Sequence, residues 1–191
     1  MLDKDVTYLD SILYVKDRIQ VLPAAELRKI PYDDLRLWCH KNGVYGLPST
    51  ELIDMIKAEI GDVTKAIEVG AGNGVFGRAL GIISTDSMIQ NTPEMVARYK
   101  KIGSPIVSYG LDVLNMEATR AIKDLKPRVV FGSWVTQHVS TDYDGPSKQG
   151  SIYGLKEVEF MQHLDKYIVY GNDHIHGDKD ILKVPGLKIT K

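Results

Sequence analysis

The chain has 191 residues, of which 43% are hydrophobic and 26% are charged, and its formal net charge is −1. This composition is typical of an ordinary globular protein and gives no signature of nucleic-acid or membrane-surface binding. The only cysteine, Cys39, excludes an internal disulfide framework and a thiolate metal cluster. The acidic start MLDKDVTYLD is unlike a secretory signal, and no apolar run approaches the ~20 residues of a membrane span. We therefore expect a cytoplasmic protein.

Residues 1–62 show helical patterns. Apolar residues recur at helical spacing near the start of the chain, and Pro23 interrupts them. After Pro31, residues 32–41 can form a short helix. Pro48 and the residue after it open another helix that Gly61 closes. We expect a helical N-terminal extension or lid over residues 1–62.

From residue 65 onward, strands and helices alternate. The expected strands are 65–69, 82–86, 105–110, 128–134 and 167–171, and the expected helices are 75–80, one beginning at 92, 115–126 and 154–166. The strands are nearly continuous apolar runs, as in a sheet covered on both faces. This order predicts an α/β domain over residues 63–191, with a mostly parallel sheet and helices on both faces. The tail 181–190 can form a hairpin around Pro185-Gly186.

A glycine loop follows the first of these strands, within AIEVGAGNGVFGRALGIISTDS. Gly70, Gly72 and Gly74 let the backbone turn sharply and approach a ligand closely, and the helix that follows offers unpaired N–H groups. Open α/β sheets bind ligands at this position. The alternative is a tight turn between strand and helix that holds no ligand.

A nicotinamide dinucleotide site fits the spacing poorly. A G-x-G-x-x-G pattern exists at Gly72, Gly74 and Gly77, but such a site needs an acid ~20 residues further on. Asp86 lies only fourteen residues after Gly72. A pattern that begins at Gly70 has Val75 in place of its third glycine.

The string EVGAGNG resembles the first motif of the class I S-adenosylmethionine-dependent methyltransferases, a Rossmann-like superfamily. The resemblance covers roughly residues 63–172 and implies the strand order 3-2-1-4-5. It implies that the loop packs under the methionine part of S-adenosylmethionine, with Asp86 on the ribose hydroxyls and Asp112-Val113 beside the adenine. The helix after the loop is short and the usual last two strands are missing or reduced to the tail, so we expect a reduced C-terminal sheet edge. The cofactor-binding residues that it implies are Glu68, Gly70, Ala71, Gly72, Asn73, Gly74, Asp86, Ser87, Asp112, Val113, Ser133 and Trp134.

The polar segment GSWVTQHVSTDYDG after the fourth strand is where this family places residues near the transferred methyl group. Ser133 and Trp134 can touch the cofactor, although a core position for the tryptophan and a simple loop position for His138 are equally compatible with the sequence. The Asn/Asp-Pro-Pro-aromatic signature of many amino-group methyltransferases is missing, which disfavours adenine and cytosine modification. The residues expected to meet the acceptor or cover the site are Tyr45, Gln137, His138, Asp142 and Tyr143. The resemblance thus implies a methyltransferase with an unidentified acceptor; the alternative is a cofactor-binding protein that has lost transfer and acts as a sensor or assembly partner.

A metal site was the remaining possibility in HIHGDKD, where His174, His176 and Asp178 have the H-x-H-x-D spacing of metallo-β-lactamase-like hydrolases. That motif continues with a histidine, whereas Lys179 follows here. It also lies early in its fold, whereas only thirteen residues remain after Asp178. We therefore expect exposed tail histidines and no metal.

Overall fold

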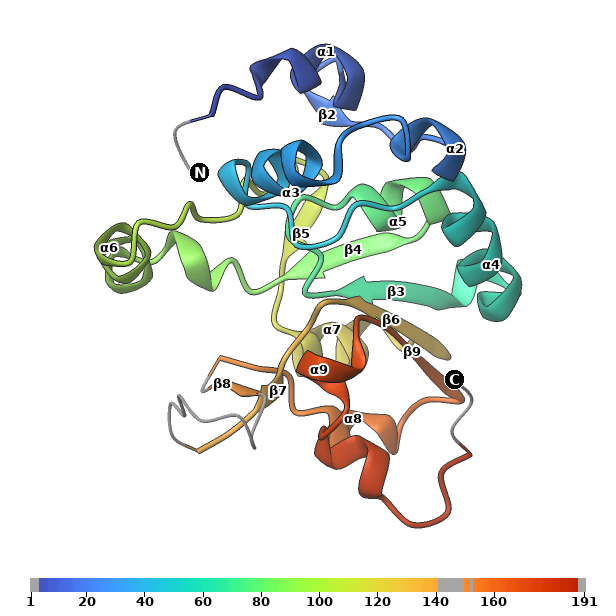
Figure 1. Ribbon diagram of the computed structural model, residues 1–191. Coiled ribbons are helices and arrows are strands. Elements are labelled where there is room, and N and C mark those ends of the chain that lie inside the picture. Colours follow the sequence, from blue (N-terminus) through green and yellow to red (C-terminus); the bar gives the residue numbers. More distant parts are fainter. Residues whose placement is uncertain (1–3, 141–149, 152, 189–191) are drawn as a thin grey trace.

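A computed structural model describes residues 4–140, 150–151 and 153–188 of the chain. Its centre is a five-stranded sheet in the order β5-β4-β3-β6-β9, and every neighbouring pair is parallel. Figure 1 shows this sheet with helices on both sides, which confirms the predicted α/β class and parallel sheet. The strands are β3 (Ala66–Val69), β4 (Ile83–Asp86), β5 (Val113–Asn115), β6 (Val129–Ser133) and β9 (Lys166–Tyr170).

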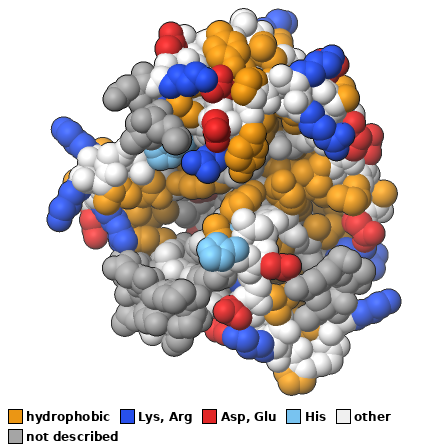
Figure 2. Space-filling model, in the orientation of Figure 1, with side chains coloured by type: hydrophobic (Ala, Val, Ile, Leu, Met, Phe, Trp, Pro, Cys, Tyr) orange, Lys and Arg blue, Asp and Glu red, His pale blue; other side chains and the backbone are white. Residues whose placement is uncertain are grey.

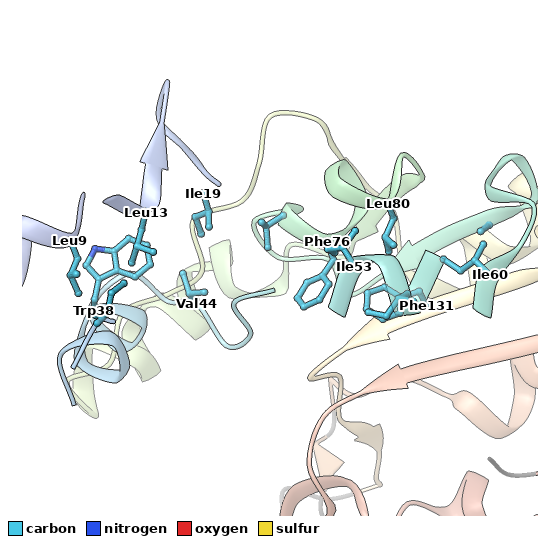
Figure 3. Close-up of a cluster of buried hydrophobic side chains, with 14 of the residues drawn as sticks. Leu9, Leu13, Ile19, Trp38, Val44, Ile53, Ile60, Phe76, Leu80 and Phe131 are labelled. Carbon is cyan, nitrogen blue, oxygen red and sulfur yellow. The ribbon is translucent and has the colours of Figure 1, made fainter. Parts of the chain in front are cut away.

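Alternate residues of the central strands face opposite sides of the sheet and enter two hydrophobic clusters. Ala66, Val129 and Phe131 belong to the larger cluster, which also contains residues of the N-terminal segment, including α4 (Thr50–Ile60), and of α5 (Val75–Leu80). Figure 3 shows this cluster extending from Leu9 and Trp38 to Phe131. The described part of the N-terminal segment, residues 4–62, is therefore packed onto the sheet through a shared core.

The opposite face of the sheet packs on α7 (Ala118–Leu125) and α8 (Glu157–Met161). Val69, Val130 and Phe160 are buried there beside three residues of α7. Outside the sheet, the helices in the second part of the chain are α5 (Val75–Leu80), α6 (Pro93–Lys101), α7 (Ala118–Leu125), α8 (Glu157–Met161) and α9 (Asp173–His176), and a two-stranded sheet joins β7 (Gln137–His138) and β8 (Gly150–Ser151).

The N-terminal segment contains two of the helices at the predicted positions, α3 (Tyr32–Lys41) and α4 (Thr50–Ile60). The Ser49 hydroxyl accepts a hydrogen bond from the backbone N–H of Leu52, and Gly61 follows the last turn with φ +72°. The segment also holds α1 (Asp10–Leu13), α2 (Ala24–Leu27) and an unpredicted hairpin of β1 (Tyr14–Val15) and β2 (Arg18–Ile19). Lys16 and Asp17 form its two-residue turn with φ +49° and +60°, which is the left-handed conformation that such hairpin turns require.

Two predictions of strands are wrong. Residues 105–110 form no strand; the third strand of the sheet is β5, which begins at Val113. In the tail, Asp180–Lys183 is a 3-10 helix, and the described residues after β9 form no strand, so the predicted hairpin around Pro185-Gly186 is not formed.

Short 3-10 helices also occupy Thr7–Leu9, Val63–Lys65 and Ile89–Asn91. In the part of the chain that is described, no helix combines the length and apolar character needed to cross a membrane.

Candidate ligand site at the carboxyl edge of the sheet

The candidate site lies where the parallel strands end together. The glycine loop follows β3, while Asp86, Asn115 and Ser133 end β4, β5 and β6. In Figure 2 the surface is hollowed near the centre of the view, in the region where Figure 1 places these strand ends between α6 and α9. Hydrophobic side chains gather in a band along this hollow.

The glycine loop adopts a conformation that side chains other than glycine rarely allow. Gly70, Gly72 and Gly74 have φ values of +62°, +55° and +71°. The Ala71 N–H donates to the carbonyl of Thr85 at 3.1 Å, which ties the loop to β4. The Asn73 side chain accepts from the N–H of Val75 at 3.0 Å and so satisfies one free donor at the start of α5.

The protein's own side chains pack closely on two of these glycines. A Cβ atom at Gly70 would lie 2.7 Å from Cγ1 of Val135, and one at Gly72 would lie 3.2 Å from Cγ1 of Val107. Both valines are buried, at 7% and 6% exposure. Internal packing is therefore one reason for glycine here, while residues 70–73 remain half-buried and keep surface toward solvent.

Asp86 lies directly against the glycine loop. Its Oδ2 accepts the N–H of Gly72 at 2.9 Å, and its Oδ1 accepts the N–H of Met88 at 2.8 Å. Burial raises the pKa of the Asp86 carboxyl, and these two N–H donors oppose that rise. Each oxygen has further lone-pair capacity, so the half-buried carboxylate can accept additional hydrogen bonds. Ser87 follows on the exposed surface.

Glu68 lies beneath the loop, at 1% exposure, and does not face the hollow. Its Oε2 accepts the N–H of Gly77 at 2.9 Å and the hydroxyl of Ser84 at 2.8 Å. Burial raises the pKa of Glu68 to about 7, even though both hydrogen bonds favour the charged form. This side chain joins β3, α5 and β4 inside the domain.

Asp112 and Val113 lie at the start of β5, whereas the resemblance implies an acid after the third strand. Asp112 Oδ1 accepts from Arg78 at 2.8 Å, and its Oδ2 lies 3.9 Å from Arg18. Val113 is buried and would be 2.7 Å from a Cβ at Gly74. The residue that pairs in register with Asp86 at the end of the strand is Asn115, an exposed amide that we did not predict.

Residues 105–110 cross the glycine loop in place of the predicted strand. The Val107 N–H donates to the side chain of Gln90 at 2.9 Å instead of to a strand neighbour. Tyr109 follows, and its hydroxyl accepts the N–H of Gln90 at 3.4 Å. Burial raises the pKa of Tyr109 to about 12, and the nearby Asp86 charge adds to the rise.

The N-terminal segment reaches this edge through Tyr45 and Gly46. The Tyr45 hydroxyl lies 3.4 Å from the Tyr99 hydroxyl of α6, and the Tyr45 side chain is exposed. Burial raises the pKa of Tyr99, and the Tyr45 contact raises it further. A Cβ at Gly46 would lie 2.8 Å from Cδ1 of Trp134, so this segment packs on the end of β6.

Trp134 follows β6 with φ +55°, an uncommon conformation for a bulky side chain. The backbone N–H of Trp134 donates to the carbonyl of Tyr170 at 2.8 Å, and Ser133 beside it is half-buried.

Among the predicted acceptor residues, Gln137 is buried and its side chain accepts the N–H of Asp180 at 2.7 Å, whereas His138 is exposed. The predicted acceptor residues Asp142 and Tyr143 lie outside the described residues.

The tail histidines differ from the prediction. His174 is exposed as expected, but His176 is buried at 7% exposure with its ring against Trp134. The difference arises because a short helix, α9, follows β9 and turns His176 back toward the sheet. Among the described residues, no group of three or more His, Cys, Asp and Glu side chains is arranged to hold a metal ion.

No known protein family, curated protein or solved structure matches the chain. The site is therefore interpreted from its own geometry: a glycine loop and a carboxylate at one strand end, with aromatic side chains around them.

Proposed function

We propose that the chain binds S-adenosylmethionine at the carboxyl edge of its sheet and transfers the methyl group to an unidentified acceptor. The observation that carries this proposal is the Asp86 carboxylate at the end of β4, hydrogen-bonded to the N–H of Gly72 in the glycine loop. The order β5-β4-β3-β6-β9 supports a Rossmann-like sheet of order 3-2-1-4-5 with a reduced C-terminal edge.

The residues present fit the methionine and ribose parts of this cofactor better than the adenine part. Residues 70–73 keep exposed backbone for the methionine part, and Asp86 retains lone pairs for two ribose hydroxyls. Asp112 does not fit the adenine role, because Arg78 and Arg18 hold it before β5. Asn115 is the better candidate for the base, since its amide can both donate and accept.

The bound cofactor would supply a methyl group on a good leaving group, and the protein would mainly need to align the acceptor. Trp134 and Ser133 stand at the strand end where such an acceptor would approach. A cofactor-binding protein without transfer activity is the second candidate. The packing of Val107 and Val135 on the glycine loop favours this second candidate.

Isothermal titration with S-adenosylmethionine and with S-adenosylhomocysteine tests the shared claim. Asp86→Ala is expected to weaken binding by about 1.5–3 kcal/mol, because an ionised acceptor is lost. Asp86→Asn, which retains one oxygen acceptor, is expected to weaken it less. Asp112→Ala is the matched control and is expected to leave the affinity unchanged. No heat with either compound, at protein concentrations well above micromolar, would refute the proposal.

Conversion of S-adenosylmethionine to S-adenosylhomocysteine in the presence of fractionated cell extract separates the two candidates. Turnover that depends on both protein and extract would establish the enzyme. Binding without turnover across all fractions would favour the sensor or assembly partner.

A further inference from the structure

A cluster of buried polar side chains lies at the carboxyl ends of β6 and β9, beside the proposed cofactor site. Asn172 caps α9 by accepting the N–H of Ile175 at 2.8 Å, and the helix turns His176 back over Gly171. A Cβ at Gly171 would lie 2.3 Å from the His176 ring, so only glycine allows this position. The His176 and Trp134 rings meet edge to face, with centroids 5.5 Å apart.

Three buried polar atoms in this cluster have no hydrogen-bond partner among the described residues. They are Nε1 of Trp134, Nε2 of His176 and Oε2 of Glu157. Native proteins pair most buried polar atoms, so three unpaired atoms close together need an explanation. Partners that bind during function are such an explanation, since each pairing recovers the cost of desolvation.

The charges under this cluster balance each other. Lys179 donates to Glu157 Oε1 at 2.5 Å, and Tyr167 donates to the same oxygen at 2.6 Å; both Lys179 and Glu157 side chains are 2% exposed. An ionic ligand would therefore meet no uncompensated charge. Burial lowers the pKa of His176, and the Lys179 charge lowers it further. The backbone of Asn172 and Trp134 and the Glu157 charge oppose this shift but do not cancel it. The His176 imidazole is therefore neutral at pH 7.

We infer that Trp134 Nε1 and His176 Nε2 form the subsite for a neutral hydroxyl group of the methyl acceptor, and that His176 takes its proton. This inference rests on the proposed function. One hydroxyl oxygen can accept from the indole N–H and donate to an imidazole lone pair, and so satisfies both atoms at once. An ammonium group cannot accept the indole N–H, and a carboxylate has no proton to donate to the imidazole.

The imidazole must then carry its own proton on Nδ1. In one tautomer Nδ1 accepts the backbone N–H of Asn172 at 3.1 Å, and in the other it donates to the Asn172 carbonyl at 3.1 Å. The inference requires the second tautomer, which leaves Nε2 as an acceptor. Donation from Nδ1 to a backbone carbonyl is a frequent way of fixing the tautomer of a functional histidine.

In the transfer step, the acceptor oxygen forms a bond to the methyl carbon as the carbon–sulfur bond breaks, and that electron pair remains on sulfur. The hydroxyl proton passes to Nε2 of His176, so the positive charge of the sulfonium ends on the imidazolium. Release of this proton to water restores the neutral ring.

The ¹⁵N chemical shifts of the His176 ring test the inference without any acceptor. We expect the neutral tautomer with the proton on Nδ1; a proton on Nε2 would overturn the assignment of His176 as proton acceptor. His176→Asn, which retains a group near Nδ1 but has none at Nε2, identifies the resonance.

Phenol and toluene, added separately to the protein with S-adenosylhomocysteine, probe the hydroxyl subsite because they have similar shapes and differ in one hydroxyl. We expect phenol, and not toluene, to shift the indole N–H resonance that Trp134→Phe removes, and His176→Asn to weaken phenol binding about tenfold. An equal response to both compounds would overturn the inference. A phenol response without S-adenosylhomocysteine binding would support the hydroxyl subsite and refute its use in methyl transfer.

Discussion

Replacing Glu68 with Gln tests whether ionisation of the buried Glu68 carboxyl lowers the free energy of unfolding as pH rises. Its pKa is about 7 in the folded protein and 4.5 ordinarily, so the folded state holds the proton over a pH range in which the unfolded chain has lost it. Stability therefore falls as pH rises from about 4.5 to about 7 and stays reduced above that range. At about 1.4 kcal/mol for each pH unit of separation, the loss amounts to about 3 kcal/mol.

The Gln amide has nearly the same shape, and its oxygen can accept the same hydrogen bonds from Gly77 and Ser84. We expect Glu68→Gln to be more stable than the wild type by up to about 3 kcal/mol at pH 8 and nearly equal to it at pH 4.5. Urea unfolding at both pH values measures the difference. Glu94→Gln, the same change on the exposed first turn of α6, is the control and is expected to have an effect within about 0.5 kcal/mol. An equal effect of Glu68→Gln at both pH values would refute this reasoning.

Three further predictions concern packing and pairing. Gly77→Ala should destabilise the fold by about 1–3 kcal/mol in urea unfolding, because its Cβ would lie 1.9 Å from the Ser84 hydroxyl; an unchanged midpoint would contradict the close approach of α5 to β4. Lys179→Met should cost about 3–5 kcal/mol because the buried Glu157 carboxylate loses its counter-charge, and adding Glu157→Gln should recover most of this loss; additive losses would show that the two side chains are not coupled. Tyr45→Phe should lower the pKa of Tyr99 toward the ordinary phenol range in an ultraviolet titration, because one of the causes that raise it is removed; an unchanged titration would contradict a contribution from the Tyr45 hydroxyl.

The sequence was sufficient to predict the β-α units around the glycine loop. Strong local signals mark them: an apolar strand, then glycines, then a helix that Gly81 ends with φ +75°. Asp86 could be placed beside the loop because parallel strands end at one edge.

The strand predicted over residues 105–110 was wrong because the local pattern and the contacts across the fold disagree. IVSY alternates like a strand, but Val107 instead packs on Gly72 and bonds to Gln90, and these are contacts across the fold that the local pattern does not contain. The shift of the strand to Val113–Asn115 in turn moved Asp112 away from the position that the resemblance implies.

The buried cluster around Trp134 and His176 was also beyond local reasoning. HIHGDKD has the polar composition of an exposed tail, and only the folded chain shows that Glu157 pairs with Lys179 under it. The hairpin at Tyr14–Ile19 was missed for a different reason, because its turn uses Lys16 and Asp17 rather than glycine.

The most direct test of cofactor binding at the glycine loop is a ¹H–¹⁵N NMR titration with S-adenosylmethionine. The amides of Gly72 and Met88 both donate to Asp86, so ribose binding to that carboxylate should shift these two resonances most, and Asp86→Asn should reduce the shifts. Gly186, in the tail, serves as the internal reference and should not move. Unchanged Gly72 and Met88 resonances at saturating cofactor would contradict the account.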